Sequence, residues 1–175
     1  MTMIVPLPDD LQVLLRTVQT GTQALAGPLS ADELRVAGLL VTGALNPAIA
    51  HELGMSEEDV RRHLDRIGQE TGARTRHTRA NCVLAAGLVP PPPVTGPAPT
   101  LSAPERLLLV GLATCETWER TAVVANLDLR TVKPATQSLL RRVGAAHRTH
   151  LVGLAYGWKL IGASTAALGH DSAGS

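Results

Sequence analysis

Apolar residues recur at helical spacing in two similar stretches of the chain. In the segment SEEDVRRHLDRI, Val60, Leu64 and Ile67 are spaced at i, i+4 and i+7, so a helix would carry them on one face. In the later segment DLRTVKPATQSLL, Val132 and Leu139 occupy the corresponding face. The pattern predicts two helices that bury these residues and expose the polar residues between them.

Helix starts are marked by a local signal that occurs twice. Ser30 with Glu33, and Ser102 with Glu105, form S-x-x-E capping boxes, in which each side chain satisfies a free backbone N–H at a helix start. The chain repeats itself without a gap at the spacing that separates Ser30 from Ser102, as LSADE and LSAPE show. We call this spacing the repeat offset. The repeat indicates two copies of one fold, each made of four short helices.

In each copy the second and third helices are expected to be joined by a short turn. Gly54, matched by Asn126, is a residue type that tolerates the left-handed conformation at a helix end. Two residues further on, Ser56 and its counterpart Asp128 are good N-caps for the next helix. Each copy therefore contains a helix, a short turn and a second helix.

The third helices are expected to end at Gly72 and Gly144, with fourth helices over about residues 76–88 and 148–161. Between the copies, four consecutive prolines in VPPPPVTGPAPT cannot enter a helix interior and predict a stiff polyproline II spacer. We divide the chain into an N-terminal helical extension over 1–28, a first domain over 29–89, a linker over 90–100, a second domain over 101–166 and a disordered tail over 167–175.

Composition argues against several classes of protein. Sixteen Lys and Arg against fifteen Asp and Glu give a net charge of +1, so contact with nucleic acid would depend on local patches. No window approaches the ~18 apolar residues of a membrane span, and no signal peptide is evident, so we expect a cytoplasmic protein without membrane contact. Cys82 and Cys115 lack C-x-x-C spacing, and the histidines form no H-x-x-x-H pattern, so we expect no metal and no cofactor.

The order of LSADEL, NPAIAHELGMS, V-R-R-H-x-x-x-I and G-A-x-x-R resembles the LuxR-type helix-turn-helix family of bacterial transcription factors. The second copy resembles it most clearly in DLRTVKPATQSLLRRVGAAHRTHLV, and the match covers residues 29–89 and 101–161. The resemblance implies an all-α chain of two tandem four-helix domains. It also implies that each third helix enters the major groove of DNA and that fourth helices mediate dimerisation.

The resemblance places the base-facing positions just after the valine at the start of each third helix. Those positions hold Arg61, Arg62, Asp65, Lys133, Pro134 and Gln137. All except the proline have side chains that can bond base edges. Candidate contacts to the DNA backbone are Arg74, Arg76, Arg79, Arg130, Thr131, Arg141, Arg142 and Arg148.

Two features oppose this interpretation of the third helices. Glu57, Glu58 and Asp59 favour a helix start but oppose contact with phosphates. Residues 29–89 accordingly carry seven positive and eight negative side chains, whereas residues 101–161 carry eight and four. The more positive copy has Pro134 inside its third helix, where a proline costs ~3 kcal/mol or bends the helix.

The sequence predicts a sequence-specific transcriptional regulator that binds double-stranded DNA. Its two domains are expected to act as an internal pseudo-dimer on an asymmetric site. The twelve residues of VPPPPVTGPAPT at ~3.1 Å each span roughly 37 Å, near the ~34 Å between half-sites. The alternative is an adaptor or anti-activator that pairs with another regulator or with RNA polymerase. A homodimer through the fourth helices is a further expectation, and the lack of a glycine-rich phosphate loop or a nucleophile elbow argues against an enzyme.

Overall fold

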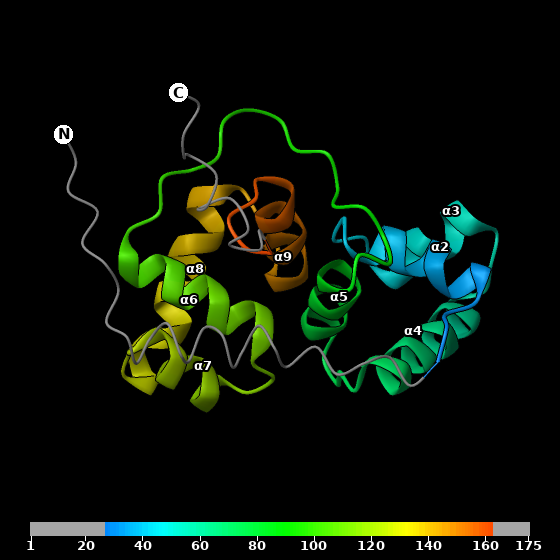
Figure 1. Cartoon of the computed structure of the whole chain (residues 1–175), viewed down its shortest axis with the longest axis horizontal. Helices are drawn as coiled ribbons and strands as arrows, with labels where there is room; N and C mark the ends of the chain where they lie inside the picture. The colour runs from blue at the N-terminus through cyan, green and yellow to red at the C-terminus, as the bar shows by residue number, and fades with distance from the viewer. Residues whose placement is uncertain (1–26, 163–175) are drawn as a thin grey trace, which may run out of the picture.

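The structure, a computed structural model, describes residues 27–162. The helix expected within residues 1–28 and the tail expected from residue 167 lie outside the described residues. Residues 27–162 form eight helices and no strand, so the prediction of an all-α fold is confirmed for this part of the chain (Figure 1).

The helices form two groups of four. The first group consists of α2 (Ala31–Leu40), α3 (Asn46–Leu53), α4 (Glu57–Thr71) and α5 (Arg76–Ala85). The second group consists of α6 (Ala103–Thr114), α7 (Trp118–Ala125), α8 (Leu129–Val143) and α9 (Arg148–Gly157). Each helix of the second group begins at the repeat offset from its counterpart in the first group, so the two groups repeat the same order of elements.

The predicted helix starts and turns are present in both groups. Ser30 and Ser102 form complete capping boxes with the glutamates three residues later. The turn between the second and third helices passes through the left-handed region at Gly54, with φ 64°, and at Asn126, with φ 51°. A side chain at Asn126 tolerates this conformation because its amide can bond locally.

The fourth helices are shorter than predicted. They end at Ala85 and Gly157, before residues 88 and 161, because the backbone turns left-handed two residues later. Gly87 has φ 67° and Lys159, at the corresponding position, has φ 58°. The apolar residues beyond these points therefore pack from irregular segments.

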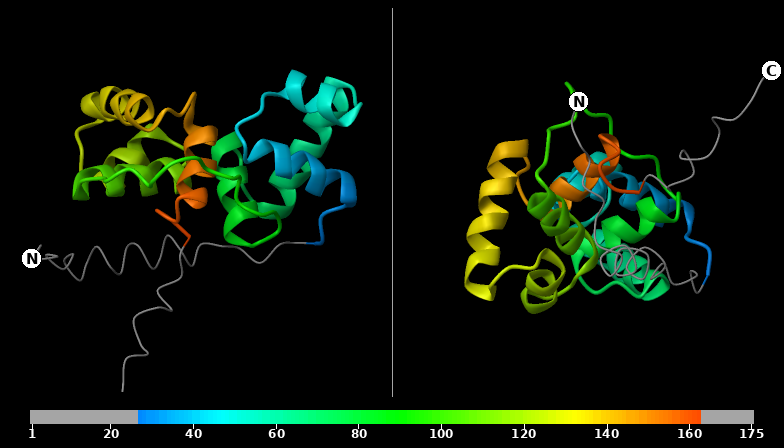
Figure 2. Two further views of the ribbon diagram at one scale, coloured as in Figure 1. Left: turned by 90° about the horizontal axis from the view of Figure 1, so that it is seen from above. Right: turned by 60° about the vertical axis from the view of Figure 1, so that its left-hand side comes forward.

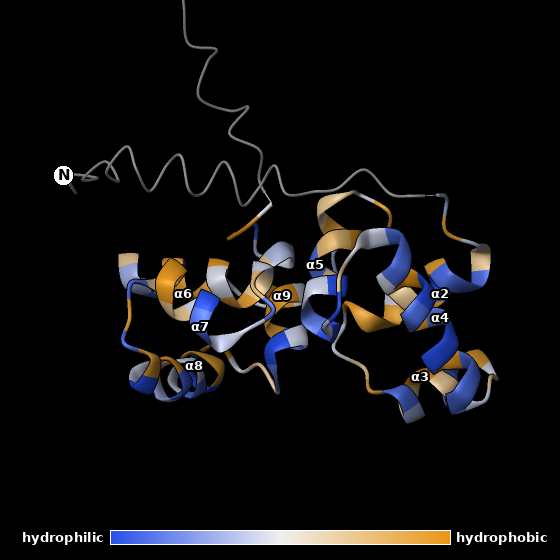
Figure 3. Cartoon of the chain, turned by 90° about the horizontal axis from the view of Figure 1, so that it is seen from below, coloured by the Kyte–Doolittle hydropathy of each residue, from blue (hydrophilic) through white to orange (hydrophobic). Residues whose placement is uncertain are grey.

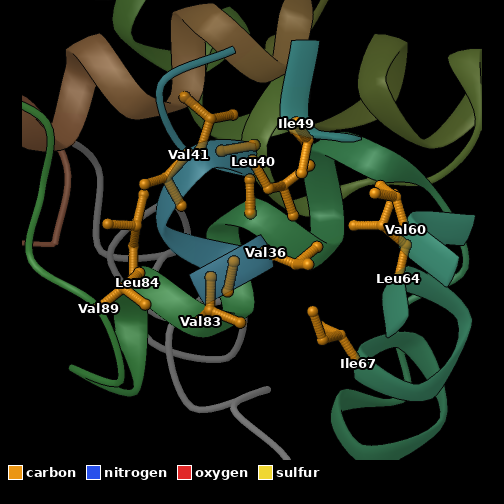
Figure 4. Packing of buried hydrophobic residues seen from close by; sticks show 14 of the residues in the cluster. Val36, Leu40, Val41, Ile49, Val60, Leu64, Ile67, Val83, Leu84 and Val89 are labelled. Carbon is orange, nitrogen blue, oxygen red and sulfur yellow. The ribbon is translucent and has the colours of Figure 1, made fainter. Parts of the chain in front are cut away.

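Each group surrounds a core of its own. In the first group, Val60, Leu64 and Ile67 point inward from α4 as predicted and meet buried side chains of α2, α3 and α5 (Figure 4). In the second group, Val132 and Leu139 are buried in the same way. Burial of a Val, Leu or Ile side chain is worth about 1.5–3 kcal/mol, so these positions fix which face of α4 and α8 remains outside.

The two groups pack directly against each other. Figure 1 shows α5 and α9 side by side, with the other helices of each group on opposite sides of this pair. A Cβ atom at Gly153 of α9 would clash with the carbonyl oxygen of Val41, so the close approach requires glycine there. Val152 belongs to the first core, which confirms that the contact is part of the hydrophobic interior.

The proline-rich linker packs against α9. A Cβ atom at Gly157 would lie 2.7 Å from the carbonyl oxygen of Pro92 and 2.5 Å from a methyl carbon of Val94. Figure 2 shows the linker passing over α9. Gly157 leaves room for the linker, which therefore helps to hold the groups together.

Candidate nucleic-acid interface

The exposed face of α4 carries the three candidate base-reading residues of the first group. Arg61, Arg62 and Asp65 are all exposed, as the position of the core requires. Arg61 forms an ion pair with Glu58, and Arg62 forms one with Asp59 at 2.7 Å. Each arginine therefore has a carboxylate three residues earlier on the same helix, and its charge is locally cancelled.

The remaining candidate on α4, Asp65, is also paired. Its carboxylate lies 3.3 Å from the guanidinium of Arg79, which additionally donates to the carbonyl oxygen of Ala73. Arg79 is largely buried, with 18% of its side chain exposed. These contacts hold Arg79 within the first group of helices. They occupy the guanidinium that was expected to contact the DNA backbone.

The three acids at the start of α4 serve the helix itself. The hydroxyl of Ser56 donates to the Asp59 carboxylate at 2.6 Å and accepts from the Asp59 N–H at 3.1 Å. This hydrogen bond and the charge of Arg62 hold the pKa of Asp59 below its ordinary value. A carboxylate at a helix N-terminus also interacts favourably with the helix dipole. Stability of the helix start thus accounts for the acidic turn.

The third helices differ sharply in charge. Five carboxylates and three arginines lie on α4, whereas α8 has four basic residues and no carboxylate. Among residues 27–162, no carboxylate forms an ion pair with Arg130, Lys133 or Arg141. Of the two third helices, α8 is therefore the one with an excess of positive charge.

The polar residues of α8 form one stripe. Arg130, Lys133, Gln137 and Arg141 are exposed and follow one another at i, i+3, i+7 and i+11, which places them along one side of a helix. The helix continues from Leu129 to Val143 through the exposed Pro134. The proline therefore leaves α8 in one piece, and the stripe extends over almost its whole length.

The candidate backbone contacts divide into two sets. Arg74, Arg130, Thr131 and Arg141 are exposed, although the Thr131 hydroxyl donates to the carbonyl oxygen of Asp128 at 2.8 Å. Arg142 pairs with Glu105 and donates to the carbonyl oxygen of Thr100. Like Arg79, it is tied to its own group.

Arg76 and Arg148 occupy equivalent places at the starts of α5 and α9. Arg76 donates to the side-chain oxygen of Asn46 at 2.6 Å and to the carbonyl oxygen of Ala44. Arg148 lies over the ring of Trp118, with its guanidinium carbon 4.5 Å from the ring centroid. Burial lowers the pKa of both guanidinium groups, and each side chain is half-buried.

Sequence reasoning singled out neither Asn46 nor Trp118 as a site residue. They occupy equivalent positions in the repeat, and each begins the second helix of its group. A second cation, the Nζ atom of Lys133, lies 5.6 Å from the centroid of the same Trp118 ring. The repeat offset is the signal that could have identified Asn46 and Trp118. It aligns these two residues with each other, and it also aligns their arginine partners, Arg76 and Arg148.

Within residues 27–162, no group of three or more His, Cys, Asp or Glu side chains is placed to hold a metal ion. None of the helices in this range has the length and apolar character needed to cross a membrane.

Comparison with models of protein families, with curated proteins and with solved structures finds no match to this chain.

Proposed function

We propose that the chain is a sequence-specific DNA-binding transcriptional regulator made of two tandem LuxR-type helix-turn-helix domains, residues 29–89 and 101–166, joined by linker 90–100. The observation that carries the proposal is the exposed stripe of α8, the second helix of a helix-turn-helix pair. The basic residues of this stripe, Arg130, Lys133 and Arg141, have no carboxylate partner among the described residues. A helix of this kind fits the major groove, where lysine and glutamine bond base edges and arginines bond phosphates.

The two helix-turn-helix pairs are proposed to act as unequal partners. α8 supplies most of the affinity, because contacts to phosphates dominate binding and depend on uncompensated positive charge. α4 contributes less, because Arg61 and Arg62 must leave Glu58 and Asp59 before they reach a base. The target site is therefore expected to be asymmetric, with stronger sequence preference on the side that α8 reads.

The packing of α5 on α9 supports an internal pseudo-dimer. In Figure 3, α8 and α3 appear toward the same edge of the view, and α5 and α9 lie between the two groups. Since each fourth helix already covers the other, we propose pairing within one chain in place of the homodimer expected from the sequence.

The test is selection of bound fragments from random DNA by the purified chain at two salt concentrations. Enrichment of one asymmetric motif supports the proposal. Binding should weaken with salt by about 0.9 logarithmic units per logarithmic unit of salt for each phosphate contacted. A folded, helical protein that enriches no motif would contradict it.

A second function is favoured by exposed apolar side chains beside the turns. Leu45, Val123 and Leu129 are exposed by 57%, 76% and 48%, and two of them flank the turn between α7 and α8. These exposed apolar residues, together with the acidic α4, suit an adaptor that pairs with another regulator or with RNA polymerase. Failure to enrich DNA, together with binding to purified polymerase, would support this second function.

A further inference from the structure

One aromatic ring in the second group contacts cations from two other helices. Trp118 is the first residue of α7 and is half-buried. The Nζ atom of Lys133 lies 5.6 Å from its ring centroid, and the guanidinium carbon of Arg148 lies 4.5 Å from it. Both distances fall within the ~6 Å over which the electron-rich face of an indole attracts a cation.

The equivalent positions of the first group are arranged differently. Asn46, Arg61 and Arg76 correspond to Trp118, Lys133 and Arg148 by the repeat offset. Arg61 turns to the carboxylate of Glu58, whereas the counterpart of Glu58 is Arg130, which cannot accept a cation. Lys133 therefore has no carboxylate one turn earlier on its helix, and it lies over the indole instead.

This difference has a direct electrostatic consequence. A carboxylate that orients a cation also cancels its charge, so the Glu58–Arg61 pair presents little net charge to solvent. An indole orients a cation through its quadrupole and has no net charge. The full positive charge of Lys133 therefore remains available beside the α8 stripe while its flexible side chain is partly ordered.

We infer that Trp118 is a positioning residue for nucleic-acid binding, which holds Lys133 and Arg148 in place for DNA without neutralising them. The inference rests on the proposed function and adds to it the residue that orders the binding face. Ordering matters because fixing a free lysine or arginine side chain has an entropic cost. A cation already held by the ring loses less freedom when DNA binds.

The test compares Trp118→Leu, which keeps an apolar side chain and removes the ring, with Trp118→Phe, which keeps an aromatic face. Binding is measured by fluorescence anisotropy with a labelled mixed-sequence duplex at low salt. Trp118→Leu is expected to weaken binding about three- to tenfold, and Trp118→Phe is expected to restore most of the loss. Circular dichroism of each variant checks that its helices are intact.

A double variant tests whether Trp118 acts through Lys133. If it does, Trp118→Leu should weaken binding less in a Lys133→Gln background than in the wild-type protein. Tryptophan emission gives an independent readout, because Trp158→Phe leaves Trp118 as the sole tryptophan of the chain. Titration of that variant with the duplex should change the emission with the same midpoint as the anisotropy.

The outcomes separate the inference from the proposed function. If the wild-type protein does not bind the duplex at low salt, the proposed function fails and the role of Trp118 fails with it. If the wild-type protein binds and Trp118→Leu binds equally well, only the inference is overturned. Unchanged Trp118 emission during a titration that saturates the anisotropy would overturn it as well.

Discussion

The Nε2 atom of His77, on α5, lies 3.0 Å from the carbonyl oxygen of Cys115, between α6 and α7. A carbonyl only accepts, so Nε2 must carry the proton and donate it across the junction between the two groups. A matching contact joins the Nε2 atom of His147 to the carbonyl oxygen of Gly43 at 2.9 Å. Gly43 and Cys115 are equivalent positions in the repeat, so each group accepts a hydrogen bond from the other at the same place in its fold.

We predict that the chain becomes less stable as the pH falls below the pKa of an unfolded histidine. Burial lowers the pKa of His77, and repulsion from Arg148 lowers it further, although the Cys115 carbonyl and Glu116 act in the opposite direction. Below about pH 6.5 the unfolded chain therefore binds more protons at this residue than the folded chain. The free energy of unfolding should fall by at most ~1.4 kcal/mol per pH unit for this group.

Urea unfolding at several pH values between neutral and mildly acidic checks this prediction. His77→Gln keeps an N–H donor for Cys115 and removes the titration, so its stability should depend less on pH. His51→Gln, at an exposed position on α3, is the matched control and should retain the wild-type dependence. Parallel pH profiles for His77→Gln and the wild-type protein would contradict the assignment.

We predict that Gly153→Ala destabilises the chain and Gly38→Ala does not. An added methyl group at Gly153 would clash with the carbonyl oxygen of Val41 where α9 meets the first group. Such overpacking costs about 1–3 kcal/mol. A methyl group at Gly38, inside α2, would meet nothing within 4 Å, and replacing a helical glycine by alanine stabilises by about 0.4–1 kcal/mol.

The measurement is thermal unfolding followed by circular dichroism. A rise in midpoint for Gly38→Ala beside a fall for Gly153→Ala is the expected pair of results. Equal midpoints for Gly153→Ala and the wild-type protein would mean that the contact of α9 with Val41 of the first group opens freely, and the internal pseudo-dimer would then lose part of its support.

Local sequence signals predicted the helices well but not their association. The S-x-x-E boxes and the left-handed residues act within a few residues of chain, and both copies form the helices that these signals indicate. Contact of α9 with Val41 and with the linker depends on Gly153 and Gly157, which appear in the sequence as unremarkable breaks in an apolar helix. Only the tertiary structure shows which neighbouring atoms lie against each glycine.

The site was predicted in part. Exposure of Arg61, Arg62 and Lys133 follows from the helical period, and the structure places them outside the cores. The ion pairs on α4 could have been predicted too, because Glu58 and Asp59 precede the arginines by three residues, a spacing that brings side chains together. Contacts of Trp118 with two other helices join residues distant in sequence, which periodicity does not reveal.

We predict that copying the charge pattern of α8 onto α4 strengthens DNA binding. Glu58→Arg with Asp59→Thr reproduces the residues at the equivalent positions of α8 and frees Arg61 and Arg62 from their ion pairs. Affinity for a mixed-sequence duplex at low salt should rise at least about tenfold, and the dependence on salt should become steeper. Anisotropy titrations at three salt concentrations measure both quantities.

The control is Asp32→Arg, which adds positive charge on α2, outside the α3–α4 pair, and is compared with Glu58→Arg alone because each substitution changes the net charge by the same amount. Its affinity should rise less than that of Glu58→Arg. Equal gains would show that total charge alone determines binding and that the geometry of α4 contributes nothing.

The last prediction concerns which helix reads sequence. On the motif selected from random DNA, Lys133→Ala with Gln137→Ala should lose about 1–3 kcal/mol for each base contact and relax specificity at those positions. Arg61→Ala with Arg62→Ala should lose less, because DNA binding by these arginines first requires breaking their pairs with Glu58 and Asp59. Arg141→Ala, at the far end of the α8 stripe, should weaken all sequences alike if it contacts phosphate. A larger loss in the α4 variant than in the α8 variant would assign the reading role to the first group and reverse the proposed division between the two.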